Sequence, residues 1–117
     1  PVATPPRAAA TVVLLRDALQ SHRLVGGVME ELTRIYLRRD LNGLVKLSEK
    51  YRPADTRVHQ AMMDRLLTQR NRNMAARLRA RLQEGNAFIA VGALHLPGET
   101  GLLQLLSNDG YRVTRVY

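Results

Sequence analysis

His95 is the residue whose type and setting are best suited to chemistry. It lies in the segment Val91–Gly98 (VGALHLPG), between a short apolar run and an expected helix. In open α/β sheets, ligands bind beyond the carboxyl ends of the strands, which is where this segment would lie. The N-terminus of the following helix would disfavour imidazolium, and neutral imidazole binds metals or accepts protons. The alternative is a loop histidine that only hydrogen-bonds a backbone carbonyl.

Two glycines flank His95 and are candidates for loop or substrate-binding positions. Gly92 would let the backbone turn away from the preceding strand without a Cβ clash, and Gly98 closes the segment before the expected helix. The Gly-x-x-His pattern that Gly92 forms with His95 is too short to establish a function by itself.

Arg70 and Asn71 are the second group of candidate site residues. They fill a gap in an apolar helical stripe formed by Met63, Leu67, Met74, Leu78 and Leu82. A buried Arg or Asn is costly unless it has a partner. The pair therefore either makes a structural hydrogen bond or lines a polar site, and both interpretations remain open. His22 and His59 have no ligand partner one helical turn away, so we expect them to be ordinary surface or helix-edge residues.

The elements that must position these residues are mostly helical. Helices are expected over residues 8–23, from residue 25 to about residue 39, from Asp40 to before Pro53, over residues 56–84 and over residues 99–108. The TVVLL run within residues 8–23 could instead be a short strand. Residues 1–7 are rich in Pro and are expected to form a linker or a ragged start.

Two short segments are predicted to be strands. Residues 86–91 (NAFIAV) are apolar throughout, as in a strand buried on both faces, and residues 111–116 (YRVTRV) follow the last helix. The predicted fold class is therefore helix-rich α/β, with several helices followed by a C-terminal parallel βαβ unit. Two parallel strands do not make a stable sheet. We therefore expect either self-association or a missing N-terminal half to complete a larger mixed sheet.

The charge of the chain is +8, from 18 Lys and Arg against 10 Asp and Glu. The basic residues are almost all Arg, which is typical of an Arg-rich proteome, and no nucleic-acid recognition motif accompanies them. We therefore expect no nucleic-acid partner, and a basic helical module that binds nucleic acid is the last of three hypotheses. The chain has no Cys, which excludes disulfides and thiolate metal sites. No apolar run reaches the roughly 20 residues of a membrane span.

Two motifs together carry a resemblance to a known family. Residues 66–75 (LLTQRNRNMA) and Phe88–Val116 (FIAVGALHLPGETGLLQLLSNDGYRVTRV) are similar to the C-terminal signature of the TraB/PrgY/GumN family. That signature has an Arg-Asn pair on a helix, a Gly-x-x-His loop, a Leu-rich helix and a Gly-Tyr-x-Val strand. Gln69 stands where the family commonly has Glu, and Leu94 stands where it commonly has Gly.

The resemblance implies that residues 8–117 are the C-terminal portion of a mixed α/β domain. Its site would be built from two Gly-x-x-His motifs and a glutamate, of which only the second motif, at His95, occurs here. His95, Arg70 and Asn71 would be the catalytic residues, with His95 also a metal ligand. Some relatives, the Tiki proteins, are metal-dependent proteases, and bacterial members often carry export signals, so the bacterial envelope is the expected location.

Three hypotheses follow from this resemblance and from the composition. The first is a fragment of a metal-dependent hydrolase acting on a peptide substrate, inactive by itself. Mn, Co or Zn would bind in the complete domain, and none would bind tightly to this chain alone, because working sites use three or more protein ligands. The second is a non-catalytic module that binds a peptide or a signalling ligand. The third is the nucleic-acid-binding module already described.

Overall fold

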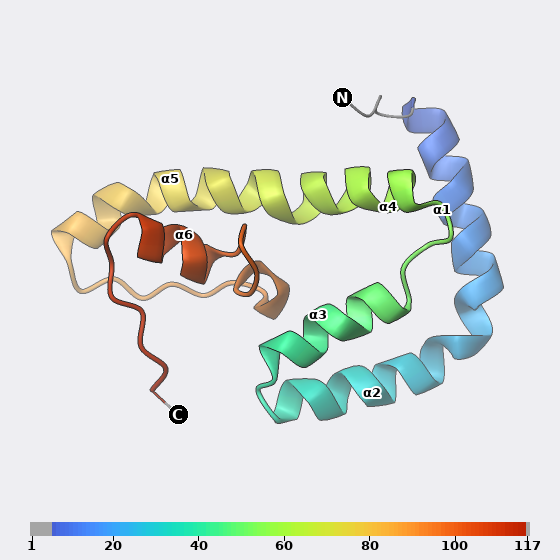
Figure 1. The fold of residues 1–117 in the computed structure, drawn as a ribbon, viewed down its shortest axis with the longest axis horizontal. Helices are drawn as coiled ribbons and strands as arrows, with labels where there is room; N and C mark the ends of the chain where they lie inside the picture. Colours follow the sequence, from blue (N-terminus) through green and yellow to red (C-terminus); the bar gives the residue numbers. More distant parts are fainter. Residues whose placement is uncertain (1–5, 117) are drawn as a thin grey trace. The chain divides into compact units, whose positions relative to one another are not determined.

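The computed structural model describes residues 6–116, which form helices joined by turns and extended segments (Figure 1). The chain divides into two compact units, Pro1–Met63 and Asp64–Tyr117, called here the first and the second unit. None of the helices within residues 6–116 combines the length and apolarity needed to cross a bilayer.

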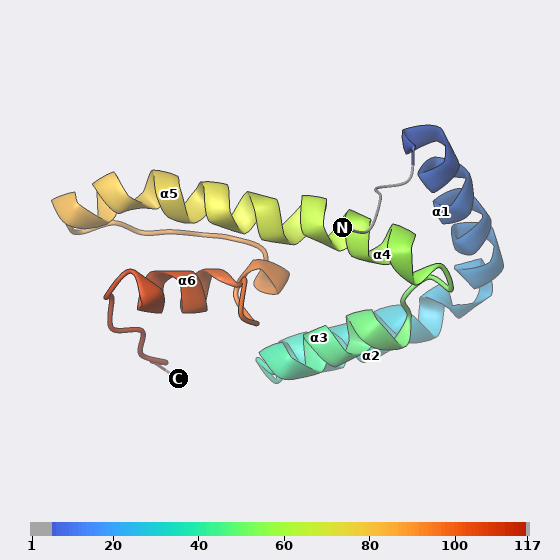
Figure 2. The same cartoon turned by 45° about the horizontal axis from the view of Figure 1, so that its top comes forward.

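The first unit is built from helices with short connections. They are α1 (Arg7–Ser21), a 3₁₀ turn (His22–Leu24), α2 (Val25–Leu37), α3 (Leu41–Lys50) and α4 (Thr56–Met63). Helices α2 and α3 lie side by side as a hairpin (Figure 2). The buried hydrophobic residues of the first unit are Leu44 and Leu47 of α3 and Val58 of α4. This small core leaves much of the apolar surface of the unit exposed.

Local capping signals start the helices of this hairpin region. The Asp40 carboxylate accepts from the Gly43 N–H at 2.8 Å, which confirms Asp40 as the N-cap of α3. Asp55 accepts from the N–H groups of Arg57 and Val58 at 3.0 and 3.2 Å, so it is the residue that caps α4. These bonds satisfy donors that a helix N-terminus otherwise leaves without a partner.

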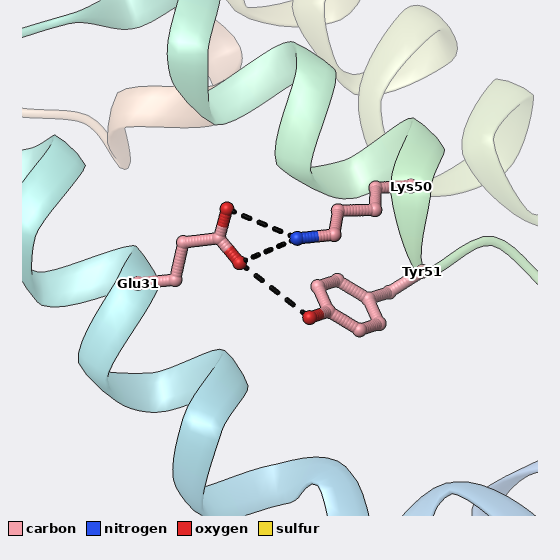
Figure 3. A network of polar contacts seen from close by, with 3 residues as sticks. All are labelled: Glu31, Lys50 and Tyr51. Carbon is pink, nitrogen blue, oxygen red and sulfur yellow. Dashed lines mark hydrogen bonds and ion pairs between the residues drawn. The ribbon is translucent and has the colours of Figure 1, made fainter.

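An ion-pair network joins α2 to the end of α3 (Figure 3). Lys50 Nζ lies 2.9 and 3.2 Å from the two carboxylate oxygens of Glu31, and the Tyr51 hydroxyl lies 3.5 Å from one of them. The hydrogen bond from Lys50 lowers the pKa of Glu31, and the hydrogen bond to Glu31 raises the pKa of Lys50. Both charged forms are therefore favoured by the folded state.

The second unit begins with a π-helical turn, Asp64–Thr68, and continues as α5 (Gln69–Glu84). The Gln69 side chain donates to Asp64 across this turn at 2.7 Å. A 3₁₀ turn (Ala93–His95) and α6 (Leu102–Asn108) follow, and α6 lies alongside α5 (Figures 1 and 2). Arg79 of α5 makes two 3.0 Å bonds to the Asp109 carboxylate, which hold the turn after α6 against α5.

The helix predictions are largely confirmed. Residues 56–84 are helical throughout, although the π-helical turn interrupts the expected regular helix, which ends at Gly85 as predicted, with φ +78°. Residues 12–15 lie within α1, so the alternative of a strand there is wrong. Residues 1–5 of the predicted linker lie outside the described residues, and Arg7 already belongs to α1.

The predicted α/β class, with its C-terminal parallel βαβ unit and larger mixed sheet, is wrong. Residues 6–116 contain no strand. The segments over residues 86–91 and 111–116 run without a strand beside either of them, and Phe88 is 94% exposed. An apolar run becomes a strand only when a neighbour completes its hydrogen-bond ladder. Because these residues form no sheet, unpaired strands give no reason to expect self-association.

Removing the Glu31 carboxylate should lower stability in a pH-dependent way. The lowered pKa of Glu31 means that its contribution is present above the ordinary pKa of a carboxyl and is lost as the pH falls through the lowered value. The raised pKa of Lys50 means that its contribution is lost only at strongly alkaline pH. We expect Glu31→Gln to lower the melting temperature slightly at neutral pH, since the pair is exposed, and we expect this deficit to shrink as the pH falls through the lowered pKa of Glu31.

The measurement is thermal unfolding followed by circular dichroism between pH ~3 and ~8. Asp17→Asn is the matched control, because the Asp17 side chain makes no ion pair with any described residue. A deficit of Glu31→Gln that persists unchanged at acidic pH would show that the ion pair is not its cause.

Candidate functional site

The backbone around His95 forms a tight turn that folds back on itself. The His95 N–H donates to the Gly92 carbonyl at 2.9 Å, and the Leu96 N–H donates to the Ala93 carbonyl at 3.2 Å. Further along, the Leu103 N–H donates to the Leu96 carbonyl at 3.3 Å, which ties the turn to α6. Because α6 begins at Leu102 and not at the predicted residue 99, Thr100 stays in the turn.

Asn71 of α5 is the residue that holds this turn. Its side chain is almost completely buried, with 2% exposed. Asn71 Oδ1 lies 2.6 Å from His95 Nδ1, and Asn71 Nδ2 donates to the Thr100 carbonyl at 2.8 Å. A further contact of 3.4 Å joins the hydroxyls of Thr68 and Thr100. We call the hydrogen-bonded residues His95, Asn71 and Thr100 the His95–Asn71–Thr100 network.

The hydrogen bonds of this network determine the protonation pattern of His95. The Thr100 carbonyl can only accept, so the group that faces it must be the Asn71 NH₂. The Asn71 oxygen then faces His95 Nδ1, and since that oxygen can only accept, Nδ1 must carry the proton. In the neutral ring, Nε2 is consequently the nitrogen with a free lone pair.

The structure separates the two residues of the predicted Arg70–Asn71 pair. Adjacent residues of a helix point about 100° apart. Asn71 is buried against the His95 turn, whereas the Arg70 side chain is exposed and makes no hydrogen bond or ion pair with any described residue. His95 and Asn71 are therefore brought together, and Arg70 is not in contact with either through a polar bond.

The glycines of the turn differ in how strongly the backbone needs them. Gly98 has φ +84°, which disfavours any residue with a side chain. A Cβ at Gly101 would overlap the carbonyl oxygens of Leu96 and Pro97. Gly92 has φ −62°, and a Cβ there would make only ordinary contact with the His95 ring at 3.6 Å. The predicted need for glycine at position 92 therefore has no steric basis. The steric need for glycine at position 101 was not predicted from the sequence.

A search for clusters of metal-ligating side chains bears on the predicted role of His95. Residues 6–116 contain no group of three or more His, Asp or Glu side chains placed to hold one ion. Catalytic zinc sites in proteins use three protein ligands, and His95 Nε2 offers one.

His59, which we expected to lie at the surface or at a helix edge, is buried. Its exposed fraction is 8%, its Nε2 lies 3.8 Å from a Glu49 oxygen, and its Nδ1 has no hydrogen-bond partner within residues 6–116. The helical spacing offered no signal for this burial, because it results from the packing of α4 in the first unit. His22 is exposed, as predicted.

Comparison with known families agrees with the two motifs that meet in the His95–Asn71–Thr100 network. The profile described as the TraB/PrgY/gumN family matches residues 7–115, which is nearly the whole chain. The chain belongs to the TraB/PrgY/gumN family. A search of curated proteins finds no significant match, and neither does a search of solved structures. Family membership is thus established by a profile that spans both units of this TraB/PrgY/gumN chain.

Replacing three glycines of this TraB/PrgY/gumN chain by alanine, one at a time, should lower its stability by three different amounts. Gly101→Ala places a methyl group against two carbonyl oxygens and should destabilise the chain by about 3 kcal/mol. Gly98→Ala forces an unfavourable positive φ and should cost about 1 kcal/mol. Gly92→Ala is the matched control and should change stability by less than about 0.5 kcal/mol. Urea denaturation followed by circular dichroism measures all three.

Proposed function

We propose that this TraB/PrgY/gumN chain contributes His95 Nε2 to the site of a metal-dependent hydrolase that acts on peptide bonds. The observation that carries the proposal is the 2.6 Å bond between His95 Nδ1 and Asn71 Oδ1, with the Asn71 amide held by Thr100. Histidines that bind metals in proteins usually donate their other ring N–H to a fixed acceptor, which orients the ring and selects the tautomer. Asn71 is such an acceptor.

The identity of the partner favours a ligand role over a general-base role. A carboxylate beside Nδ1 would stabilise the imidazolium that forms when Nε2 takes up a proton. The Asn71 amide has no formal charge, so it orients the ring without adding that stabilisation. With Nδ1 donating to Asn71, the neutral form of the ring has its lone pair on Nε2, which is the form a metal binds.

Arg70 is assigned a substrate role in this proposal. It follows the π-helical turn and precedes Asn71 on α5, with its guanidinium exposed and without a hydrogen bond or ion pair to any described residue. A guanidinium donates several hydrogen bonds in one plane, which suits peptide carbonyls and terminal carboxylates. Gly98, which has positive φ, keeps the turn beside His95 compact and free of a side chain.

The remaining ligands of the proposed site lie outside the described residues. One imidazole holds a divalent transition metal too weakly for catalysis, and Mn, Co and Zn are the metals that the family resemblance suggests. The chain alone is therefore expected to show neither tight metal binding nor peptide hydrolysis.

The tautomer of His95 gives a direct test of the network. In ¹⁵N-labelled protein above the range where imidazole titrates, the long-range ¹H–¹⁵N spectrum should show His95 protonated at Nδ1. Asn71→Ala should lose this preference and should destabilise the chain by about 2 kcal/mol, because it leaves the Thr100 carbonyl and His95 Nδ1 without partners. Asn73→Ala, an exposed change on the same helix, is the control and should do neither. A proton on Nε2 in the unaltered chain would overturn the proposal.

Calorimetric titration with Mn, Co and Zn salts tests the metal part. Only weak binding is expected, with dissociation constants above about 100 μM, because one imidazole is the available ligand at this site. Any zinc signal from the network should disappear in His95→Ala and remain in His22→Ala, which removes an exposed imidazole elsewhere. Micromolar one-to-one binding that His95→Ala abolishes would show that the described residues form a metal site after all.

A further inference from the structure

The first unit leaves one face of α2 without a covering element. Gly26, Met29, Thr33 and Leu37 recur at spacings of three and four residues, so they share this face. Met29 is 52% exposed and Leu37 is 73% exposed. The half-buried residues of α2, Val28, Leu32 and Ile35, lie on the opposite side of the helix, where Glu31 bonds Lys50 at the end of α3. The exposed side chains are therefore not part of the α2–α3 contact.

Two opposite charges border the apolar residues on this face. Glu30 and Arg34 line the same shallow hollow as Met29, Thr33 and Leu37. Neither the Glu30 carboxylate nor the Arg34 guanidinium makes a hydrogen bond or ion pair with a described residue. The α2 face, defined as these five residues with Gly26, thus carries one acid and one base, one helical turn apart. The charge of Arg34 also acts on Glu31 of the same helix, but without a hydrogen bond.

We propose that a second copy of this chain covers the α2 face, with the two α2 helices antiparallel. A two-fold axis at the level of Leu32 would place Glu30 of each copy opposite Arg34 of the other. The same axis brings Leu37 to the level of Gly27 of the second copy, next to Gly26, and nothing lies within 4 Å of a Cβ placed at either glycine. A two-fold interface uses the same patch twice, so it requires a face that is complementary to itself.

Charge complementarity is what selects this occupant. A purely apolar stripe would fit many partners. The exposed stripe on α1, with Val12, Leu15 and Leu19, is bordered by Arg16 and, one turn further on, by the uncharged Gln20. On the α2 face the acid and the base are arranged so that an inverted copy satisfies both at once. Large exposed apolar residues bordered by polar ones are a recognised mark of protein interfaces.

The size of the interface sets the expected strength. Helix α2 has 13 residues, so it is about 20 Å long. One pair of such helices buries less than the roughly 1,200–2,000 Å² of a stable interface. The dimer should therefore be weak, with a dissociation constant of about 10–100 μM, and its formation should depend on concentration.

Sedimentation velocity on the full chain between about 5 and 500 μM tests this proposal. We expect the unaltered chain to shift from monomer to dimer across this range. Glu30→Arg alone and Arg34→Glu alone should each weaken the dimer about tenfold or more, because like charges then face each other across the two-fold axis. An equimolar mixture of these two variants should restore a dimer, because the heterodimer has two opposite-charge pairs.

The mixture separates an effect between chains from an effect within one helix. Each single variant has like charges one turn apart in its own α2, and this feature is unchanged by mixing. Leu37→Asp should abolish the dimer, and Leu19→Asp, which alters an equally exposed Leu on α1, should leave it intact. A chain that stays monomeric at the highest concentration, a mixture that does not recover, or a dimer lost only in Leu19→Asp would overturn the proposal.

Discussion

The second unit depends on the need of one buried amide to satisfy both of its ends. Asn71 is 2% exposed, so its carbonyl and its NH₂ must find partners within the protein. They find them in His95 and in the Thr100 carbonyl, on two sides of the same turn. Because the amide cannot flip without placing donor against donor at one end and acceptor against acceptor at the other, it orders the turn and the ring together.

Neighbouring residues of α5 acquire different roles from this constraint. Asn71 faces the turn, and both ends of its amide are hydrogen-bonded there, whereas Arg70 points about 100° away and its guanidinium is exposed to solvent. Arg79 closes the other end of the α5–α6 pair through Asp109, whose hydrogen bonds raise the pKa of the guanidinium. As a result, Nδ1 of His95 is bonded to Asn71, and Nε2 makes no hydrogen bond with a described residue. Hydrogen bonds join the turn that carries His95 to α5 and to α6.

The helices were largely predictable, and the site was partly so. The Asp40 cap and the Gly85 stop follow from side chains and backbone angles within one helical turn, and both are found. The gap in the apolar stripe at Arg70 and Asn71 correctly marked a polar residue that needed a partner, but not which of the two is buried. The strands over residues 86–91 and 111–116 were wrong, because apolar composition does not supply the neighbour that a strand requires.

By itself the sequence determined the helical segments, their caps, the +8 charge and the family, since each depends on residue types or on contacts within a few positions. Only the tertiary structure decided the tautomer of His95, the need for Gly101 and the burial of His59. The Asn71 bonds span 24 and 29 positions of the chain, and no periodicity records which distant groups a fold brings within hydrogen-bond distance. The physical reason is that a hydrogen bond depends on orientation and distance, which only packing supplies.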